Sequence, residues 1–324
     1  MGISGEQALD CFRSDDLVGI GMEADAVRRR LHPESVVSYV IGCSIDCAAV
    51  MDVGTQAGNT SGVGCAHRVF DEIGETVAMG GTGARLVCGS ELEMGGGIEW
   101  LEGLFRGIKQ RFPSIWIEGL SAAEVVTNAG ACGLGLQETL ARLREAGLDS
   151  ISGNGVDLAD GVGQGRAGRF SVPEWVEVHR AAHRVGMRTA ATMTFGAGET
   201  LEQRVDFLQA VRQLQEETGG FAAFVPVAAA APGGRELDGV TAVERLKTLA
   251  ISRMFLDNIE NMQTIGAAQG IKVLQMGLRF GANDVGPVAP ECSGASEEDV
   301  RRIIRDAGFM PVQRDMVYRT MMLN

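Results

Sequence analysis

The sequence predicts a parallel α/β barrel, and three of its features support that prediction. Short runs of β-branched and small apolar residues alternate about eight times with amphipathic helical segments. The runs are almost continuously apolar, which is typical of strands buried on both faces of a parallel sheet. No Pro-rich or charged linker interrupts the alternation, so we expect one domain over residues 1–324. A doubly wound open sheet is the alternative, because periodicity alone does not close a sheet.

The predicted elements follow one another in a regular order. Residues 5–31 have apolar side chains at helical spacing and belong to an N-terminal helical cap over residues 1–35. The predicted strands are 36–41, 84–88, 115–118, 149–151, 189–193, 221–225, 262–265 and 274–278. The predicted helices between them are 65–79, 97–111, 122–131, 137–146, 173–185, 200–218 and 240–258. Residues 287–324 form a C-terminal extension with a capped helix at 296–306 and an extended segment at 309–314.

Composition excludes several classes of function. The chain has 324 residues, of which 45% are hydrophobic, and it can therefore bury a large core. Its formal net charge of −13 argues against nucleic acid or an anionic membrane as the main partner. We find no apolar run of transmembrane length and no basic leader followed by an apolar segment, and we expect a cytoplasmic protein. The 7 scattered cysteines fit a reducing compartment.

A two-cysteine segment follows the first predicted strand. Cys43 and Cys47 are four residues apart, where we expect the chain to turn out of the sheet. Three thiolates in such a loop at a barrel mouth hold three irons of a [4Fe–4S] cluster. The third position is Val50, which cannot ligate iron. A cluster is therefore doubtful, unless Cys65 or Cys88 folds back to supply the third sulfur.

Six stretches far apart in the chain carry a resemblance to a known family. They are Gly-Ile-Glu-Trp at 97–100, Leu-Arg-Glu-Ala-Gly-Leu-Asp-Ser-Ile at 143–151, residues 192–196 with 199–202, Asp-Asn-Ile at 257–259, residues 278–286 and residues 304–314. The chain resembles the radical SAM enzymes of the futalosine route to menaquinone, most of all the cyclic dehypoxanthinyl futalosine synthases. The resemblance covers nearly the whole chain. It implies a TIM-like (β/α)8 barrel of the radical SAM type, S-adenosylmethionine (SAM) as cofactor and, in the family, a [4Fe–4S] cluster.

The chain departs from the family pattern where the family keeps its chemistry. The family's three cysteines are reduced to two, and another placement of the gap puts Met51, Thr55 and Gly58 at the ligand positions, which leaves no thiolate. The family's histidine after the fifth strand is Ala197, and its aromatic positions after the sixth strand are Val-Ala-Ala-Ala-Ala at 227–231. Because these changes fall at the carboxyl ends of the strands throughout the barrel, they indicate an active site that has been remodelled or has lost its function.

Seven residues are candidates for binding SAM. The turn of Gly89, Ser90 and Glu91 resembles the family's turn for the methionyl amino group, which a carboxylate suits. Ser152 and Asn154 follow the fourth strand and could reach the ribose hydroxyls. Thr192 and Thr194 alternate along the fifth strand, toward the cavity. The alternative for Ser152 and Asn154 is that they only form a turn. The alternative for one of the two threonines is ordinary β-propensity.

Two carboxylates are candidates for a catalytic base. Glu118 ends the third predicted strand, and Asp157 replaces a glutamate of the family after the fourth. Partial desolvation in a barrel mouth would raise the pKa of such a carboxylate and allow it to accept a proton near neutrality. The alternative is a salt bridge to an arginine such as Arg85 or Arg188. His179 and His183 have the spacing of a zinc pair, but without a third ligand we expect them on the outer surface of the barrel.

Three functions remain open at this stage. The leading hypothesis is a SAM-binding transferase or lyase that has lost its cluster and performs non-radical transfer, elimination or cyclisation on a small molecule. The second is an active radical SAM enzyme of the cyclic dehypoxanthinyl futalosine synthase type with an atypical ligand set. The third is a catalytically silent barrel that binds a related enzyme. The sequence names neither the co-substrate nor the oligomeric state.

Overall fold

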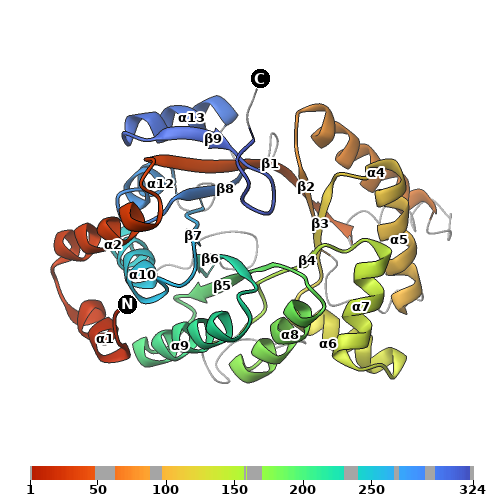
Figure 1. Ribbon diagram of the computed structural model, residues 1–324, viewed down its shortest axis with the longest axis horizontal. Coiled ribbons are helices and arrows are strands. Elements are labelled where there is room, and N and C mark those ends of the chain that lie inside the picture. The colour runs from red at the N-terminus through yellow and green to blue at the C-terminus, as the bar shows by residue number, and fades with distance from the viewer. Residues whose placement is uncertain are drawn as a thin grey trace.

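The protein is built from parallel strands arranged in a ring, with helices on the outside (Figure 1). The computed structural model describes residues 2–47, 63–87, 97–156, 158, 170–229, 240–265, 270–288 and 296–321. Five strands are adjacent in the order β4-β3-β2-β1-β8, and β9 pairs with β1. A second sheet has the order β5-β6-β7. All of these pairs are parallel, as the predicted α/β fold requires.

A few backbone contacts connect the two sheets at the two junctions. The amide of Thr192 in β5 donates to the carbonyl of Gly153 after β4, over 3.3 Å. At the other junction the amide of Thr264 donates to the carbonyl of Asp284, over 2.9 Å, and a parallel bridge joins Gln263 to Asp284. The strands therefore follow one another in barrel order, although the pairing is regular only within each sheet.

The strand bounds agree with the sequence prediction except in two places. The strands are β1 (Val36–Asp46), β2 (Gly83–Val87), β3 (Trp116–Gly119), β4 (Ser150–Ile151), β5 (Thr189–Phe195), β6 (Phe221–Ala228), β7 (Asn261–Met262), β8 (Asp284–Val288) and β9 (Met310–Gln313). First, β1 continues five residues beyond the predicted end at Ile41, because β2 pairs with it as far as Asp46. Second, the predicted eighth strand at 274–278 is wrong: these residues are helical or follow a helix, and β8 lies further on.

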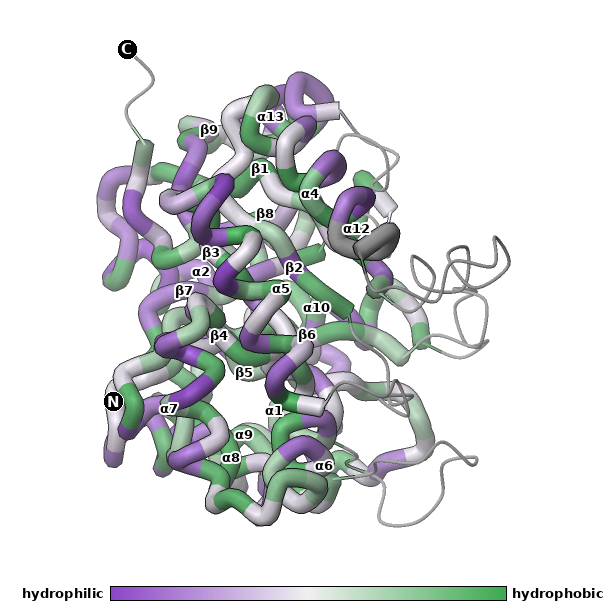
Figure 2. The backbone as a smooth tube through the Cα atoms, turned by 90° about the vertical axis from the view of Figure 1, so that its right-hand side faces the viewer, coloured by the Kyte–Doolittle hydropathy of each residue, from purple (hydrophilic) through white to green (hydrophobic). Residues whose placement is uncertain are grey.

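The helices alternate with the strands and cover the ring from outside. Their bounds are α1 (Gly5–Arg13), α2 (Leu17–Leu31), α4 (Val63–Ala78), α5 (Gly97–Arg111), α6 (Ala122–Cys132), α7 (Leu136–Ala146), α8 (Val172–Arg184), α9 (Leu201–Thr218), α10 (Ala242–Phe255), α12 (Ile271–Gly277) and α13 (Glu297–Asp306). The interior strand β6 is mainly hydrophobic, whereas the helices carry both kinds of residue (Figure 2). Apolar helix faces pack on the strands and form the core.

Local sequence signals explain where several helices begin and end. Ser121, Ser171, Thr200 and Ser296 each cap a helix, and the third helical residue closes a capping box with the cap. At the other end Gly219 adopts φ 62° after α9, a conformation that costs glycine little. The helix predicted at 296–306 is thus confirmed as α13. The two N-terminal helices lie against α9 and α10, outside the ring.

Candidate functional site

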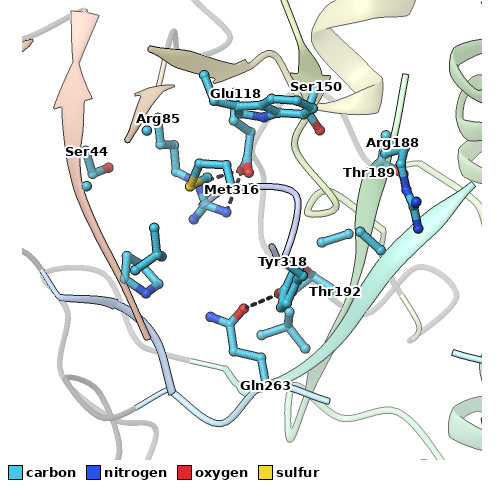
Figure 3. A pocket seen from close by; sticks show the side chains of 18 of the residues that line it. Ser44, Arg85, Glu118, Ser150, Arg188, Thr189, Thr192, Gln263, Met316 and Tyr318 are labelled. Atoms are coloured by element: carbon cyan, nitrogen blue, oxygen red, sulfur yellow. Dashed lines mark hydrogen bonds and ion pairs between the residues drawn. The ribbon is translucent and has the colours of Figure 1, made fainter. Parts of the chain in front are cut away.

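A cavity of about 300 Å³ occupies the lumen of the strand ring. Strands β1 to β6 and β8 contribute side chains to its wall, and residues after β7 and β9 complete it. Polar groups from several elements converge there, among them Arg85, Glu118, Thr192, Gln263 and Tyr318 (Figure 3). A concave site of this kind, largely apolar with a few convergent polar groups, is the usual form of a small-molecule site.

An ion pair crosses two neighbouring strands inside the cavity. Arg85 in β2 and Glu118 in β3 are register partners. Both Nε and Nη2 of Arg85 donate to Oε1 of Glu118, over 2.7 and 2.6 Å. The attraction of Glu118 raises the pKa of the Arg85 guanidinium above its ordinary value. Among the described residues nothing hydrogen-bonds Oε2 of Glu118 or Nη1 of Arg85, so both atoms are available to a ligand.

The C-terminal segment forms one wall of the cavity. Residues 314–320, here called the C-terminal hairpin, follow β9 and turn inward, with an antiparallel bridge between Arg314 and Thr320. Met316 and Tyr318 line the cavity. The Tyr318 hydroxyl donates to Oε1 of Gln263 over 3.3 Å, as drawn in Figure 3. Met316 lies against Gly83, the first residue of β2, so the hairpin closes the end of the lumen where the strands begin.

A buried ion pair anchors this hairpin. Nε and Nη2 of Arg314 donate to the two carboxylate oxygens of Asp284 at the start of β8, over 2.5 and 2.9 Å. The Ser38 hydroxyl in β1 donates to Oδ2 of Asp284, over 2.6 Å. Asp284, the first residue of β8, therefore fixes the segment that closes the lumen.

Cys43 in β1 and Cys47, which follows the strand, have different surroundings. Gly42 and Ser44 line the cavity, whereas Ile45 and Cys47 belong to the hydrophobic core. Cys47 is 2% exposed. Cys43 borders the cavity and also packs against the core, and it stands within the strand, about 10 Å before its end at Asp46. Within the described ranges, no three His, Cys, Asp or Glu side chains gather in a metal-binding group.

The predicted site residues fall into three groups. Glu118, Asn154 and Thr192 line the cavity. Ser152 and Thr194 are described but do not line it; Oγ of Ser152 accepts the amide of Asn154 over 3.4 Å, in a turn. The residues outside the described part of the chain are Gly89, Ser90, Glu91 and Asp157. The same holds for the residues considered as cluster ligands at positions 50, 51, 55, 58 and 88. The roles proposed for all of them remain predictions.

The sequence reasoning missed Gln263 and Tyr318 as cavity residues and named Arg85 only as a salt-bridge partner. Arg85 carried a signal, because a charged residue between Ala84 and Leu86 in a buried strand must face a polar space. Gln263 and Tyr318 carried none, since their position depends on how distant segments pack.

The expected surface position of His179 is wrong. It is 0% exposed, its ring packs against that of Trp175, and its Nδ1 lies 3.0 Å from Oγ1 of Thr189. Nε2 of His183 lies 3.0 Å from the same oxygen. Burial lowers the pKa of both imidazoles, that of His183 to about 4. His179 belongs to the core and His183 is partly buried beside it, and among the residues described no three metal-ligating side chains gather there.

Comparison with known proteins assigns the family. The cyclic dehypoxanthine futalosine synthase of Halalkalibacterium halodurans is 32% identical over 98% of this chain and 90% of its own. The enzyme of the same name from Streptomyces coelicolor is also 32% identical, over 99% of this chain and 86% of its own. The profile of the CofH/MqnC C-terminal region matches residues 218–323. The chain belongs to the CofH/MqnC family of radical SAM enzymes.

A further relative and one solved structure are similar to this chain. The 5-amino-6-(D-ribitylamino)uracil–L-tyrosine 4-hydroxyphenyl transferase of Methanothermobacter thermautotrophicus is 33% identical over 98% of this chain and 91% of its own. The crystal structure of methylornithine synthase (PylB) superposes with a TM-score of 0.65, covering 96% of this chain and 94% of that one at 15% identity. The second match bears on the fold alone, and it confirms the predicted α/β fold.

Membership in the CofH/MqnC family confirms two further predictions. The relatives are synthases and transferases, so the chain is an enzyme by family. Their names describe small-molecule chemistry, as expected for a cavity of this size. No helix in the described ranges is long and apolar enough to cross a bilayer.

Proposed function

We propose that this enzyme binds SAM or a related nucleoside in the barrel lumen and uses it without a [4Fe–4S] cluster, in polar chemistry on a small molecule. The single observation that carries the proposal is the position of Cys43 and Cys47. Cys43 sits inside β1 and Cys47 in the hydrophobic core, so the pair does not stand together on the lumen wall.

The donor set around the lumen supports this proposal. A radical SAM cluster needs three thiolates held in one loop at the mouth of the barrel. Cys43 precedes the mouth and Cys47 is 2% exposed. The third position of the pattern that begins at Cys43 is Val50, and the alternative gap placement uses Met51, Thr55 and Gly58; neither placement supplies three thiolates. These residues do not fit a cluster, and no step of the proposed chemistry passes through one.

The lumen offers groups suited to a nucleoside and its attached polar end. SAM carries a sulfonium that makes the adjacent carbon electrophilic, so orientation and desolvation suffice for a polar reaction. Asn154 and Thr192 provide hydrogen-bonding groups to ribose hydroxyls from the wall. Trp116 lines the same cavity and offers an aromatic face. Glu91 is retained as the residue for the methionyl amino group.

Two carboxylates remain candidates for the base. Both guanidinium contacts from Arg85 go to Oε1 of Glu118, which leaves Oε2 open to a substrate proton. Asp157 lies outside the described residues and stays the second candidate for the base, with a salt bridge to an arginine as the alternative.

The experiment that tests the proposal measures iron and acid-labile sulfide after anaerobic reconstitution, with SAM binding by calorimetry on the same sample. We expect no stoichiometric iron and clear SAM binding. The Glu91→Ala variant should lose SAM binding, whereas Glu23→Ala, an exposed carboxylate on α2, should bind SAM as the parent does.

Two other outcomes would replace the proposal. About four irons per chain with a SAM-dependent change in the cluster spectrum would establish a radical enzyme with an unusual ligand set. In that case Cys43→Ser and Cys47→Ala would show whether these residues hold iron. Neither iron nor SAM binding would indicate the silent barrel that binds a related enzyme.

A further inference from the structure

The C-terminal hairpin holds the side chain of Tyr318 in the lumen. Oδ1 of Asp315 accepts the amides of Val317 and Arg319, over 2.9 and 2.8 Å, which closes a tight turn. The amide of Asp315 donates to the carbonyl of Arg319, over 2.9 Å. Tyr318 stands in this turn, and its side chain lines the cavity (Figure 3).

Tyr318 adopts a backbone conformation that glycine would adopt at lower cost. Its φ is 65°, in the left-handed region, where a bulky residue is strained by about 1–3 kcal/mol. Strain of this kind persists where the surroundings fix the backbone, and it concentrates at ligand sites. A glycine here would relieve the strain but would leave the lumen without the phenol ring.

Several contacts hold the ring in one place. The guanidinium carbon of Arg314 lies 3.7 Å from the centre of the Tyr318 ring. That same guanidinium is bound to Asp284, and the side chains of this ion pair are 3% and 0% exposed. The ring is therefore positioned by the buried ion pair that joins the hairpin to Asp284 of β8, and not by loop packing alone.

The Tyr318 hydroxyl retains capacity for a ligand. Burial raises its pKa, so the group stays protonated at neutral pH. Its one proton makes a long hydrogen bond to Oε1 of Gln263, and an oxygen of the ligand can replace Gln263 as the acceptor. Arg85 and Glu118 are close enough to act on its titration, and Nη1 of Arg85 has no hydrogen-bond partner among the described residues.

We propose that Tyr318, Gln263 and Arg85 form a polar subsite for the innermost end of the lumen ligand. The ligand class that fits is a small molecule whose buried end carries a carbonyl or carboxylate oxygen. That oxygen would accept from Arg85 and from the Gln263 amide or the tyrosine hydroxyl. The inference rests on the proposed function only in placing a small molecule in the lumen.

The chain is well suited to a direct test, because it contains only 2 tyrosines. The other one, Tyr39, lies in β1 and donates to Glu297 of α13, outside the lumen. Incorporation of 3-fluorotyrosine gives two fluorine resonances, which Tyr39→Phe and Tyr318→Phe assign. On titration with SAM we expect the Tyr318 resonance to shift and that of Tyr39 to stay, which serves as the internal control.

An affinity measurement completes the test. Tyr318→Phe should weaken SAM binding about tenfold, as expected for the loss of one hydrogen bond. Tyr318→Gly should weaken it further while melting no lower than Tyr318→Ala, because glycine relieves the strain. A shifted Tyr318 signal with weaker binding by Tyr318→Phe supports the subsite. SAM binding with a silent Tyr318 signal, or with unchanged affinity in Tyr318→Phe, overturns the subsite and leaves the proposed function intact.

If SAM does not bind, the proposed function fails and the subsite is tested with other probes. Adenosine and benzoate are titrated into the same fluorinated protein, the first as a nucleoside and the second as a small aromatic carboxylate. A shift of the Tyr318 resonance with either probe supports the subsite for that class of ligand. No shift with any of the three compounds overturns it.

Discussion

Arg85 and Glu118 form an ion pair across β2 and β3 within the barrel lumen, and both guanidinium contacts go to the same carboxylate oxygen. The Glu118 side chain is 12% exposed and that of Arg85 is 40% exposed. The pair is thus half protected from water while it faces the cavity. This arrangement makes its two residues mutually dependent, both in stability and in ligand binding.

The first prediction concerns this dependence. Arg85→Ala and Glu118→Ala should each lower the free energy of unfolding by about 1–2 kcal/mol, because each leaves a partly buried charge without its partner. The double variant should lose less than the sum of the two, with a coupling of about 1 kcal/mol. Urea unfolding of all four proteins measures the cycle; strict additivity would show that the pair contributes nothing.

The second prediction concerns the anchor of the C-terminal hairpin. Arg314→Ala should destabilise the protein by about 3–5 kcal/mol, since it leaves the fully buried carboxylate of Asp284 without its ion-pair partner. Arg302→Ala is the matched control, because the Arg302–Asp299 pair is exposed and should contribute less than about 1 kcal/mol. Equal losses in the two variants, measured by denaturant unfolding, would contradict a special role for the Arg314 pair.

The third prediction concerns the close approach of the hairpin to β2. A Cβ atom at Gly83 would lie 2.4 Å from both Cγ and Sδ of Met316, so Gly83→Ala should displace the hairpin and cost about 1–3 kcal/mol. Gly103→Ala is the control: it is exposed on α5 with no atom within 4 Å, and alanine there should stabilise by up to about 1 kcal/mol. Combining Gly83→Ala with Met316→Ala should restore much of the stability that Gly83→Ala alone removes. A tolerated Gly83→Ala single variant would argue against the contact.

The fourth prediction concerns pH. Burial, followed by the charge of Arg188, lowers the pKa of His183 to about 4, from an ordinary value of 6.5. The folded state therefore resists protonation that the unfolded chain accepts. The resulting stability is present above pH 6.5 and is lost as the pH falls toward 4, by up to about 3 kcal/mol.

The measurement for this prediction is the melting temperature between pH 7.5 and pH 4.5. His183→Gln should flatten the decline with falling pH, whereas His67→Gln, at an exposed position, should leave its slope unchanged. The same slope in His183→Gln and in the parent would assign the acid sensitivity to other groups, such as His179.

Much of the fold was predictable because it depends on local patterns. Five helices begin with a capping box that the sequence displays, and eight of the nine strands overlap a predicted apolar or extended run. The failure at 274–278 has a local cause. A run of Leu, Gln, Met, Gly and Leu is too short for its period to decide between a strand and a helix.

The candidate site was only partly predictable. Glu118 and Thr192 were found because a polar residue near the end of a buried parallel strand has few places to point. Which arginine would meet Glu118 depended on strand register, and two candidates were open until β2 and β3 were aligned at Arg85. Tyr318 and Glu118 line the same cavity but are 200 residues apart, and local periodicity carries no information about positions so distant in the chain.

By itself, the sequence determined the order of helices and strands, the α/β class and the family, because these follow from hydrophobic period, capping signals and stretches of identical residues. The tertiary structure decided what the lumen contains. The alternation of side chains along β1 follows from the local sequence. Only the pairing with β2 showed that the strand continues to Asp46 and includes Cys43. Likewise, only the anchoring of Arg314 on Asp284 brought Tyr318 into the cavity. A ligand site inside a barrel is made by contacts between residues far apart in the chain, and those contacts are set by packing and register.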